Sequence, residues 1–275
     1  MGSDMSQIFQ AIDALLQTDT GFFVGMGRNL FTGLATIMIV WFGIKSALSS
    51  GSREGGFQFS NFASLILVIA FGEAMVTYYA TPIPGIGRSF HSLVTDEAHF
   101  LSQQILQAQL DTLMQQITDF SRTIPTPSIA DLTATVLYAV SVILVAAAQA
   151  IALVVIAYGF IAQAVCVLVG PVFIPFFVVP KLDWLFWGWF KAFLQFSFYQ
   201  VVASAVVYII GNVLTAFLRA HTAPGISLLA LFPSLFIVFL GSIYALLKIP
   251  SLTNAIFSGS SGGSSGFILG GRLIP

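Results

Sequence analysis

The fold of this chain is decided by the stretch VGPVFIPFFVVPKLDWLFWGWFKAF, residues 169–193. It is almost wholly apolar, yet it contains three prolines, and three tryptophans follow within six residues. Proline does not fit the interior of a regular helix, and so large an apolar segment would aggregate if it were exposed to water. Its structure therefore depends on the solvent that surrounds the chain.

Composition indicates that this solvent is largely lipid. Hydrophobic residues make up 57% of the 275 residues and charged residues only 8%, whereas a soluble domain averages roughly 25% charged residues. The net charge of −1 gives no basic surface for nucleic-acid binding. The single cysteine, Cys166, excludes an intrachain disulfide.

Five apolar runs are long enough to cross a membrane, which takes about 20 residues. They are residues 30–48, 61–80, 132–169, 191–218 and 226–248. The sequence thus predicts an all-α, polytopic membrane protein. As a helix, 132–169 would measure about 57 Å against a hydrocarbon core of roughly 30 Å, so part of it should protrude or tilt.

Three regions outside these runs have a character of their own. Residues 1–29 contain an amphipathic helix, expected on a membrane surface, on a partner or on the protein's own bundle. Residues 81–131 form a polar loop with a helix at about 97–121, and residues 251–275 form a Gly/Ser-rich tail. The loop helix carries an apolar stripe, expected at an assembly contact, that includes Leu110, Leu113 and Ile117.

Lys and Arg near the ends of the runs favour one orientation. With the N-terminus outside, six of them lie on the inner side and four on the outer side. This predicts an N-terminus and an 81–131 loop outside, with the tail inside.

The opening stretch fits this layout as a break between the third and fourth runs. The prolines are expected to end the helix at the inner interface. Trp and Lys prefer the headgroup level, so 181–190 is expected to lie in the interface plane as a connector. An ordinary connector with an aromatic belt would account for these physical features.

The wider segment VLVGPVFIPFFVVPKLDWLFWGWFKAFLQFSFYQV, residues 167–201, also resembles the core signature of the TrbL/VirB6 family. Gly170 and Pro171 match the family's Gly-Pro, Lys181 its basic connector and Trp189 its tryptophan. Pro175 and Pro180 interrupt the apolar run between them. The tail is shorter than in many relatives, which puts in doubt any function that a longer tail carries.

The resemblance implies an inner-membrane component of a bacterial type IV secretion or conjugation system. It implies a homo-oligomer without enzymatic activity or cofactor, at the base of the secretion stalk. The implied partners are the minor and major pilins, the energising ATPase, periplasmic scaffold proteins and membrane lipid, with transient contact to a DNA or protein substrate.

Known catalytic motifs are missing from the sequence. It has no phosphate-binding loop and no H-E-x-x-H, and its three histidines are scattered. We therefore predict no catalytic, cofactor-binding or metal-binding residues.

Polar residues inside the apolar runs form stripes. The fourth run carries Ser197, Gln200, Ser204, Tyr208, Asn212, Thr215 and Arg219 within about a 120° arc, at 100° per residue. The third run carries a similar set, Tyr138, Ser141, Gln149, Gly159, Gln163 and Gly170. Such stripes hold helices together in membranes, or they line a hydrated path or an oligomer lumen.

Glu73 is the one carboxylate well inside an apolar run, and an intramembrane acid is a functional-site hypothesis. Alternatively it lies near the outer interface, which Tyr78 and Tyr79 indicate is close.

Two rival functions remain. A small-solute transporter would be expected to show paired broken helices, but only one broken segment is present, at 170–180. A membrane scaffold without a conduit is harder to distinguish from a channel component.

Overall fold

The computed structural model of the protein describes residues 2–49, 59–105, 132–220 and 228–258. Within these ranges the chain is helical and contains no strand, which confirms the all-α prediction. The elements are α1 (Gly2–Ser49), α2 (Phe59–Thr77), α4 (Leu132–Phe173), the 3₁₀ helix η1 (Ile174–Val178), α5 (Asp183–Ala220), α6 (Leu228–Leu247) and α7 (Ile249–Ser258). The segment 92–105 is also helical.

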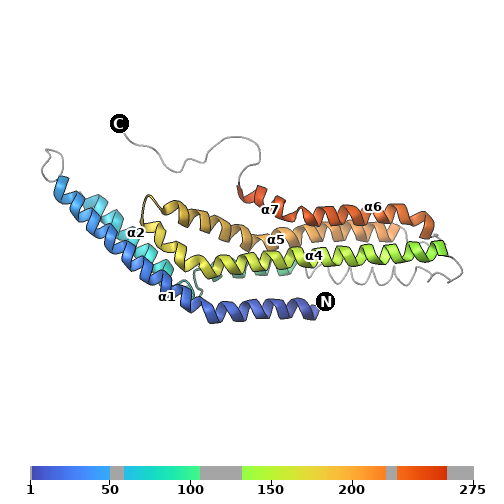
Figure 1. The fold of residues 1–275 in the computed structure, drawn as a ribbon, viewed down its shortest axis with the longest axis horizontal. Coiled ribbons are helices and arrows are strands. Elements are labelled where there is room, and N and C mark those ends of the chain that lie inside the picture. The colour runs from blue at the N-terminus through green and yellow to red at the C-terminus, as the bar shows by residue number, and fades with distance from the viewer. Residues whose placement is uncertain (1, 50–58, 106–131, 221–227, 259–275) are drawn as a thin grey trace, which may run out of the picture.

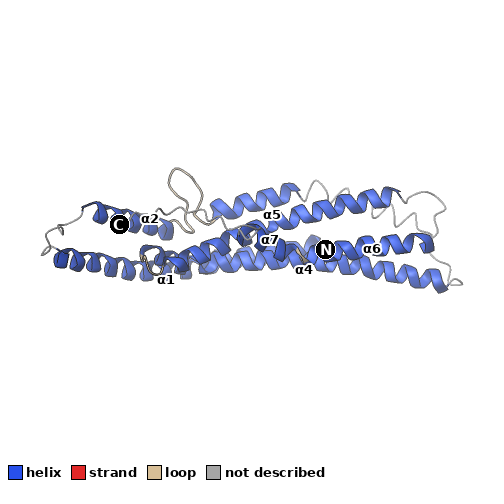
Figure 2. Cartoon of the chain, turned by 90° about the horizontal axis from the view of Figure 1, so that it is seen from above, coloured by secondary structure: helices blue, strands red, loops and turns tan. Residues whose placement is uncertain are grey.

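The molecule is elongated (Figure 1). At one end, α1 and α2 form a hairpin that extends past the turn between α4 and α5. Toward the other end α4, α5 and α6 lie side by side, and the N-terminal half of α1 runs along them (Figures 1 and 2). Helix α4 is central, because it contacts α1, α5 and α6.

Four helices are long and apolar enough to cross a membrane, and a fifth crossing is counted if α6 and α7 form one bent span. The four stretches are Thr20–Leu48, Phe59–Thr77, Thr135–Val178 and Asp183–Phe217. The polytopic helical fold that the apolar runs predict is thus confirmed.

Three helices exceed the thickness of one hydrocarbon core. Helices α1, α4 and α5 have 48, 42 and 38 residues, which correspond to about 72, 63 and 57 Å. Residues 1–29 were expected to be separate from the first crossing, but the two are continuous in α1. No proline occurs in 2–49, so nothing in that segment forces a break.

The break between α4 and α5 is much shorter than the predicted 170–190. Helix α4 continues through Gly170 and Pro171, and η1 begins directly after it. Only 179–182 lie outside a helix, so most of the predicted connector 181–190 is the first two turns of α5. A proline removes one hydrogen bond from a helix, and Pro175 sits at the start of η1, where a helix does not need its N–H.

The C-terminal tail also begins later than expected. Residues 251–258 belong to α7, whose axis is bent by 42° from that of α6, and 259–275 lie outside the described residues.

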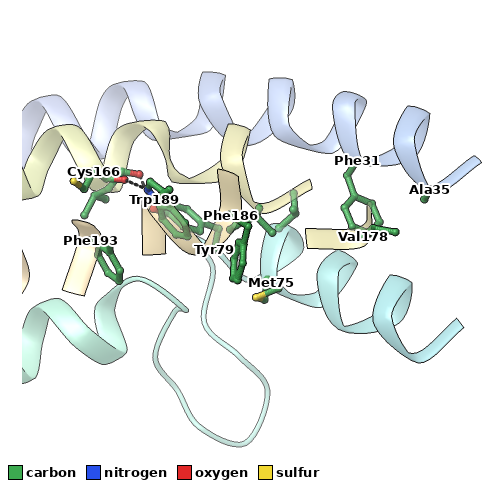
Figure 3. Packing of buried hydrophobic residues seen from close by; sticks show 12 residues of the cluster. Phe31, Ala35, Met75, Tyr79, Cys166, Val178, Phe186, Trp189 and Phe193 are labelled. Atoms are coloured by element: carbon green, nitrogen blue, oxygen red, sulfur yellow. Dashed lines mark hydrogen bonds between the residues drawn. The ribbon is translucent and has the colours of Figure 1, made fainter. Parts of the chain in front are cut away.

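The main hydrophobic core lies where α1, α2, α4, η1 and the start of α5 meet (Figure 3). Its buried members are Phe31, Ala35, Met75, Val76, Tyr79, Cys166, Val167, Ile174, Val178, Phe186, Trp189 and Phe193. Two smaller clusters, around Tyr199 and around Leu214, follow along the α4–α5–α6 bundle. Pro171 and Pro175 are therefore packed inside the protein.

The backbones of α1 and α4 come close together at Gly27. A Cβ atom on Gly27 would lie 2.2 Å from the carbonyl oxygen of Pro171. We predict that Gly27→Ala lowers the free energy of unfolding by about 1–3 kcal/mol, the usual cost of overpacking. Thermal unfolding in detergent, followed by tryptophan fluorescence, measures it.

Gly33→Ala is the matched control, because a Cβ there meets nothing within 4 Å. It should leave stability unchanged or raise it by up to about 1 kcal/mol through helix propensity. Equal effects at the two glycines would contradict the close approach.

Candidate functional site

Pro171 leaves a backbone acceptor without its helical donor. A proline has no N–H, so it cannot donate to the carbonyl four residues earlier, which is that of Val167. In its place the Tyr79 hydroxyl donates a hydrogen bond to the Val167 oxygen at 2.6 Å. Tyr79 is fully buried and comes just after the end of α2. The proline thus creates the acceptor that ties the α2 end to α4.

The neighbouring carbonyl, that of Cys166, holds α5 through a further hydrogen bond. Trp189 Nε1 donates to the carbonyl oxygen of Cys166 at 2.8 Å (Figure 3). The indole is only 6% exposed and stacks on Phe193, with ring centroids 5.6 Å apart. Buried Trp usually finds a partner for its N–H, and here that partner is helix backbone.

Glycine makes room for both donors. A Cβ on Gly170 would lie 2.1 Å from the Tyr79 hydroxyl oxygen and 2.5 Å from Trp189 Cζ2. Gly170 therefore admits the two rings, and Pro171 supplies the acceptor. We call the set Gly27, Tyr79, Gly170, Pro171 and Trp189 the Gly-Pro junction.

The three tryptophans of the opening stretch have different environments. Trp184 is 64% exposed and Trp187 is 52% exposed, whereas Trp189 is in the core. Lys181 and Pro180 are also exposed, and Pro175 is buried. The stretch thus combines an outward aromatic belt with one inward anchor.

The loop after α2 is fixed to the junction by His91. Its ring packs against Tyr79 with centroids 5.4 Å apart. Burial lowers the pKa of His91, partly opposed by the charge of Asp96, so the neutral form is favoured in the folded protein. On either side of His91 in the sequence, the exposed Arg88 donates a hydrogen bond to Glu97 and forms an ion pair with it.

A second polar feature connects three helices farther along the bundle. Ser102, in the helical segment 92–105, shares a hydrogen bond of 2.8 Å with Ser204 of α5. Ser204 Oγ donates to the Gln200 carbonyl at 2.7 Å, and the Gln200 side-chain amide donates to Gln163 of α4. All four side chains are buried. This buried polar chain joins the segment after α2 to α5 and α4.

The polar stripe of α5 contains both buried and exposed side chains. Ser197, Gln200, Ser204 and Thr215 are buried in the bundle. Tyr208, Asn212 and Arg219 are exposed on the adjoining face. The stripe therefore straddles the edge of the interface instead of lying wholly inside or outside it.

These features position helices relative to one another. The described residues contain no group of three or more His, Cys, Asp or Glu side chains that could hold a metal ion.

A family model described as TrbL/VirB6 plasmid conjugal transfer protein matches residues 35–249, more than half of the chain. The chain belongs to this family. No curated protein matches the chain.

The TrbL/VirB6 match confirms the family resemblance and includes Tyr79, Gly170, Pro171 and Trp189 of the junction, while Gly27 lies before it. Members of this family are structural components of conjugal transfer systems, and the family is not a known enzyme family. The roles of the individual residues remain predictions.

Glu73 lies in a polar group at the end of α2. Its carboxylate accepts a hydrogen bond from Thr77 at 3.2 Å and lies 3.9 Å from Nε of Arg28 on α1. Arg28 also donates to Thr77 at 3.1 Å. Both charged side chains are about half exposed, so Glu73 has a counter-charge and is open to its surroundings.

Some predicted site residues cannot be placed. Leu110, Leu113 and Ile117 lie outside the described residues, as does the side chain of Gln149. Conversely, the sequence did not indicate Gly27, Tyr79 or Ser102 as site residues. Because Val167 lies four residues before Pro171, the sequence could have indicated that its carbonyl lacks a helical donor. It could not have indicated that Tyr79 supplies the hydrogen bond instead.

Removing the Tyr79 hydroxyl should leave the buried Val167 carbonyl without a donor. We predict that Tyr79→Phe lowers the free energy of unfolding by about 1–3 kcal/mol. Trp189→Phe should cost at least as much, since it also loses ring contacts. Tyr208→Phe and Trp187→Phe, at exposed positions, are the controls and should stay within about 0.5 kcal/mol in a detergent melt.

The amide pair between α4 and α5 allows a double-mutant cycle. Gln163→Met or Gln200→Met alone should cost about 1–3 kcal/mol, because each leaves a buried amide without its partner. The double variant should cost clearly less than the sum of the two. Additive losses in denaturant or heat unfolding would show that the two amides do not depend on each other.

Proposed function

We propose that this protein is a channel or stalk-base component in the inner membrane of a bacterial type IV secretion system. In this role it assists the translocation of DNA or protein and the assembly of the pilus. The observation that carries the proposal is the TrbL/VirB6 match, which extends from within α1 to the start of α7. The multi-pass helical fold supports it.

The geometry favours a conduit between copies of the chain over one within a single copy. Gln163, Gln200 and Ser204 are buried and hydrogen-bonded to one another's side chains or backbone, which favours a role in helix packing over the lining of a path inside the bundle. The exposed side of the stripe, at Tyr208, Asn212 and Arg219, would then face the neighbouring subunits of a homo-oligomer.

A scaffold without a conduit is the second candidate, and the Gly-Pro junction favours it. The junction holds four elements together at one point through buried contacts, which suits a rigid support. Purification separates the candidates: a ring with an axial opening supports a conduit, and a closed assembly supports a scaffold. A monomer with an enclosed polar site would support a small-solute transporter instead.

For orientation we propose a periplasmic N-terminus and 81–131 loop and a cytoplasmic C-terminus, on the Lys/Arg asymmetry. Leu110, Leu113 and Ile117 would then meet a neighbouring subunit or a pilin in the periplasm. Periplasmic scaffold proteins would be reached from that side, and the energising ATPase from the cytoplasm.

The function is tested by substrate transfer from cells in which this gene is deleted and then restored. We predict that Trp189→Ala abolishes transfer while the protein remains inserted in the membrane, because the α5 anchor at the junction is lost. Trp184→Phe and Trp187→Phe should transfer nearly as well as the wild type, since both indoles are exposed.

Membrane-fraction blots of each variant separate lost function from lost protein. If the deletion strain transfers normally, the proposed function is wrong. If all three tryptophan-to-alanine variants transfer normally, the stretch serves only as an aromatic belt.

A further inference from the structure

A shallow groove lies on the outside of the bundle, between α4 and the end of α6. Its volume is about 190 Å³. Its lining is wholly apolar and consists of Ala150, Ile151, Val154, Val155 and Leu247. Val154 is 64% exposed and Leu247 is 57% exposed, so the groove opens to the surroundings of the protein.

A lysine stands next to this groove. Lys248 directly follows Leu247 and is exposed, and its Nζ lies 5.4 Å from the centroid of the Tyr244 ring. Among the described residues it has no carboxylate partner within salt-bridge distance. A cation beside an apolar groove on a membrane helix complements an amphiphile with a negative headgroup.

The level of Lys248 matches a membrane surface. Helix α6 has 20 residues, about 30 Å, which is the thickness of a hydrocarbon core. Lys248 follows its last residue, where a lysine reaches the headgroups. The bend of 42° then turns α7 away from the axis of α6 (Figure 1).

Helix α7 has the surface of a helix that lies in the interface plane. Ile249 and Thr253 are fully buried against the bundle. Leu252 and Ile256, one turn apart, are exposed, and so are Ser251 and Asn254. One side of α7 thus packs on protein, while the rest offers an apolar line for lipid and polar groups for water.

We propose that the elbow between α6 and α7 binds a phospholipid with an anionic headgroup. Lys248 pairs with the phosphate, and one acyl chain lies in the groove. Because the lining has no hydrogen-bonding side chain, the groove suits a hydrocarbon chain and not a polar solute. Its volume is below the roughly 300 Å³ of the smallest typical ligand pockets, which fits a chain segment rather than a whole headgroup. The site depends neither on a conduit nor on the identity of the cargo.

The headgroup part is tested on the purified full-length chain by native mass spectrometry with added phosphatidylglycerol or phosphatidylcholine. The wild type should retain phosphatidylglycerol in preference. Lys248→Gln should reduce that preference about fivefold, the factor for one lysine near an anionic surface, and Lys248→Arg should keep it. Lys191→Gln, an exposed lysine on α5, is the matched control and should behave as the wild type.

The groove is tested separately by filling it. Ala150→Phe should reduce the retention of both lipids, whereas Ala139→Phe, at an exposed position of α4 outside the groove, should not. Melting temperatures of all variants in detergent show whether each one is folded. Equal retention of the two lipids by the wild type, undiminished preference in Lys248→Gln, or equal losses in the two phenylalanine variants would each overturn the proposal.

Discussion

The carbonyl group that Pro171 leaves open on Val167 is the constraint on which the main core depends. An unsatisfied carbonyl in an apolar core is costly, and within a membrane no water reaches it. The Tyr79 hydroxyl satisfies it, and the adjacent Cys166 carbonyl takes the Trp189 indole. Two residues far apart in the sequence are thus bound to one turn of α4. Gly170 allows both rings to approach α4. The Gly-Pro pair therefore forms the position on α4 at which the end of α2 and the start of α5 are held.

Proline acts here as a source of specificity rather than as a helix terminator. The apolar surfaces of lipid-facing helices resemble one another, so they define relative positions poorly. Directional hydrogen bonds to two adjacent carbonyls, and a glycine where no Cβ would fit, define a single arrangement. Gly27 does the same from α1, where its backbone lies against Pro171.

The sequence predicted an all-α polytopic fold well, because the length of apolar runs can be read from the residues alone. It predicted the broken segment less well. A proline in a sequence marks the loss of one hydrogen bond, but only tertiary contacts decide whether the helix ends or continues. At Pro171 the lost bond is replaced from Tyr79, so α4 goes on to Phe173. Periodicity likewise placed Gln200 and Tyr208 on one stripe, yet Gln200 is buried and Tyr208 is exposed, because the packing of neighbouring helices decides which members of a stripe are covered.

The junction and the buried polar chain act on the same pair of helices. Gln163 and Gly170 are two turns apart on α4, and Trp189 and Gln200 are three turns apart on α5. The segment that follows α2 is attached at both features, through Tyr79 and His91 at its start and through Ser102 farther on. Two buried attachments fix the orientation of a segment, whereas a single attachment would leave it free to rotate. The residues that continue from 105 into the polar loop therefore start from a position set by α4 and α5. The segment after α2 and the packing of α4 against α5 therefore depend on the same buried contacts.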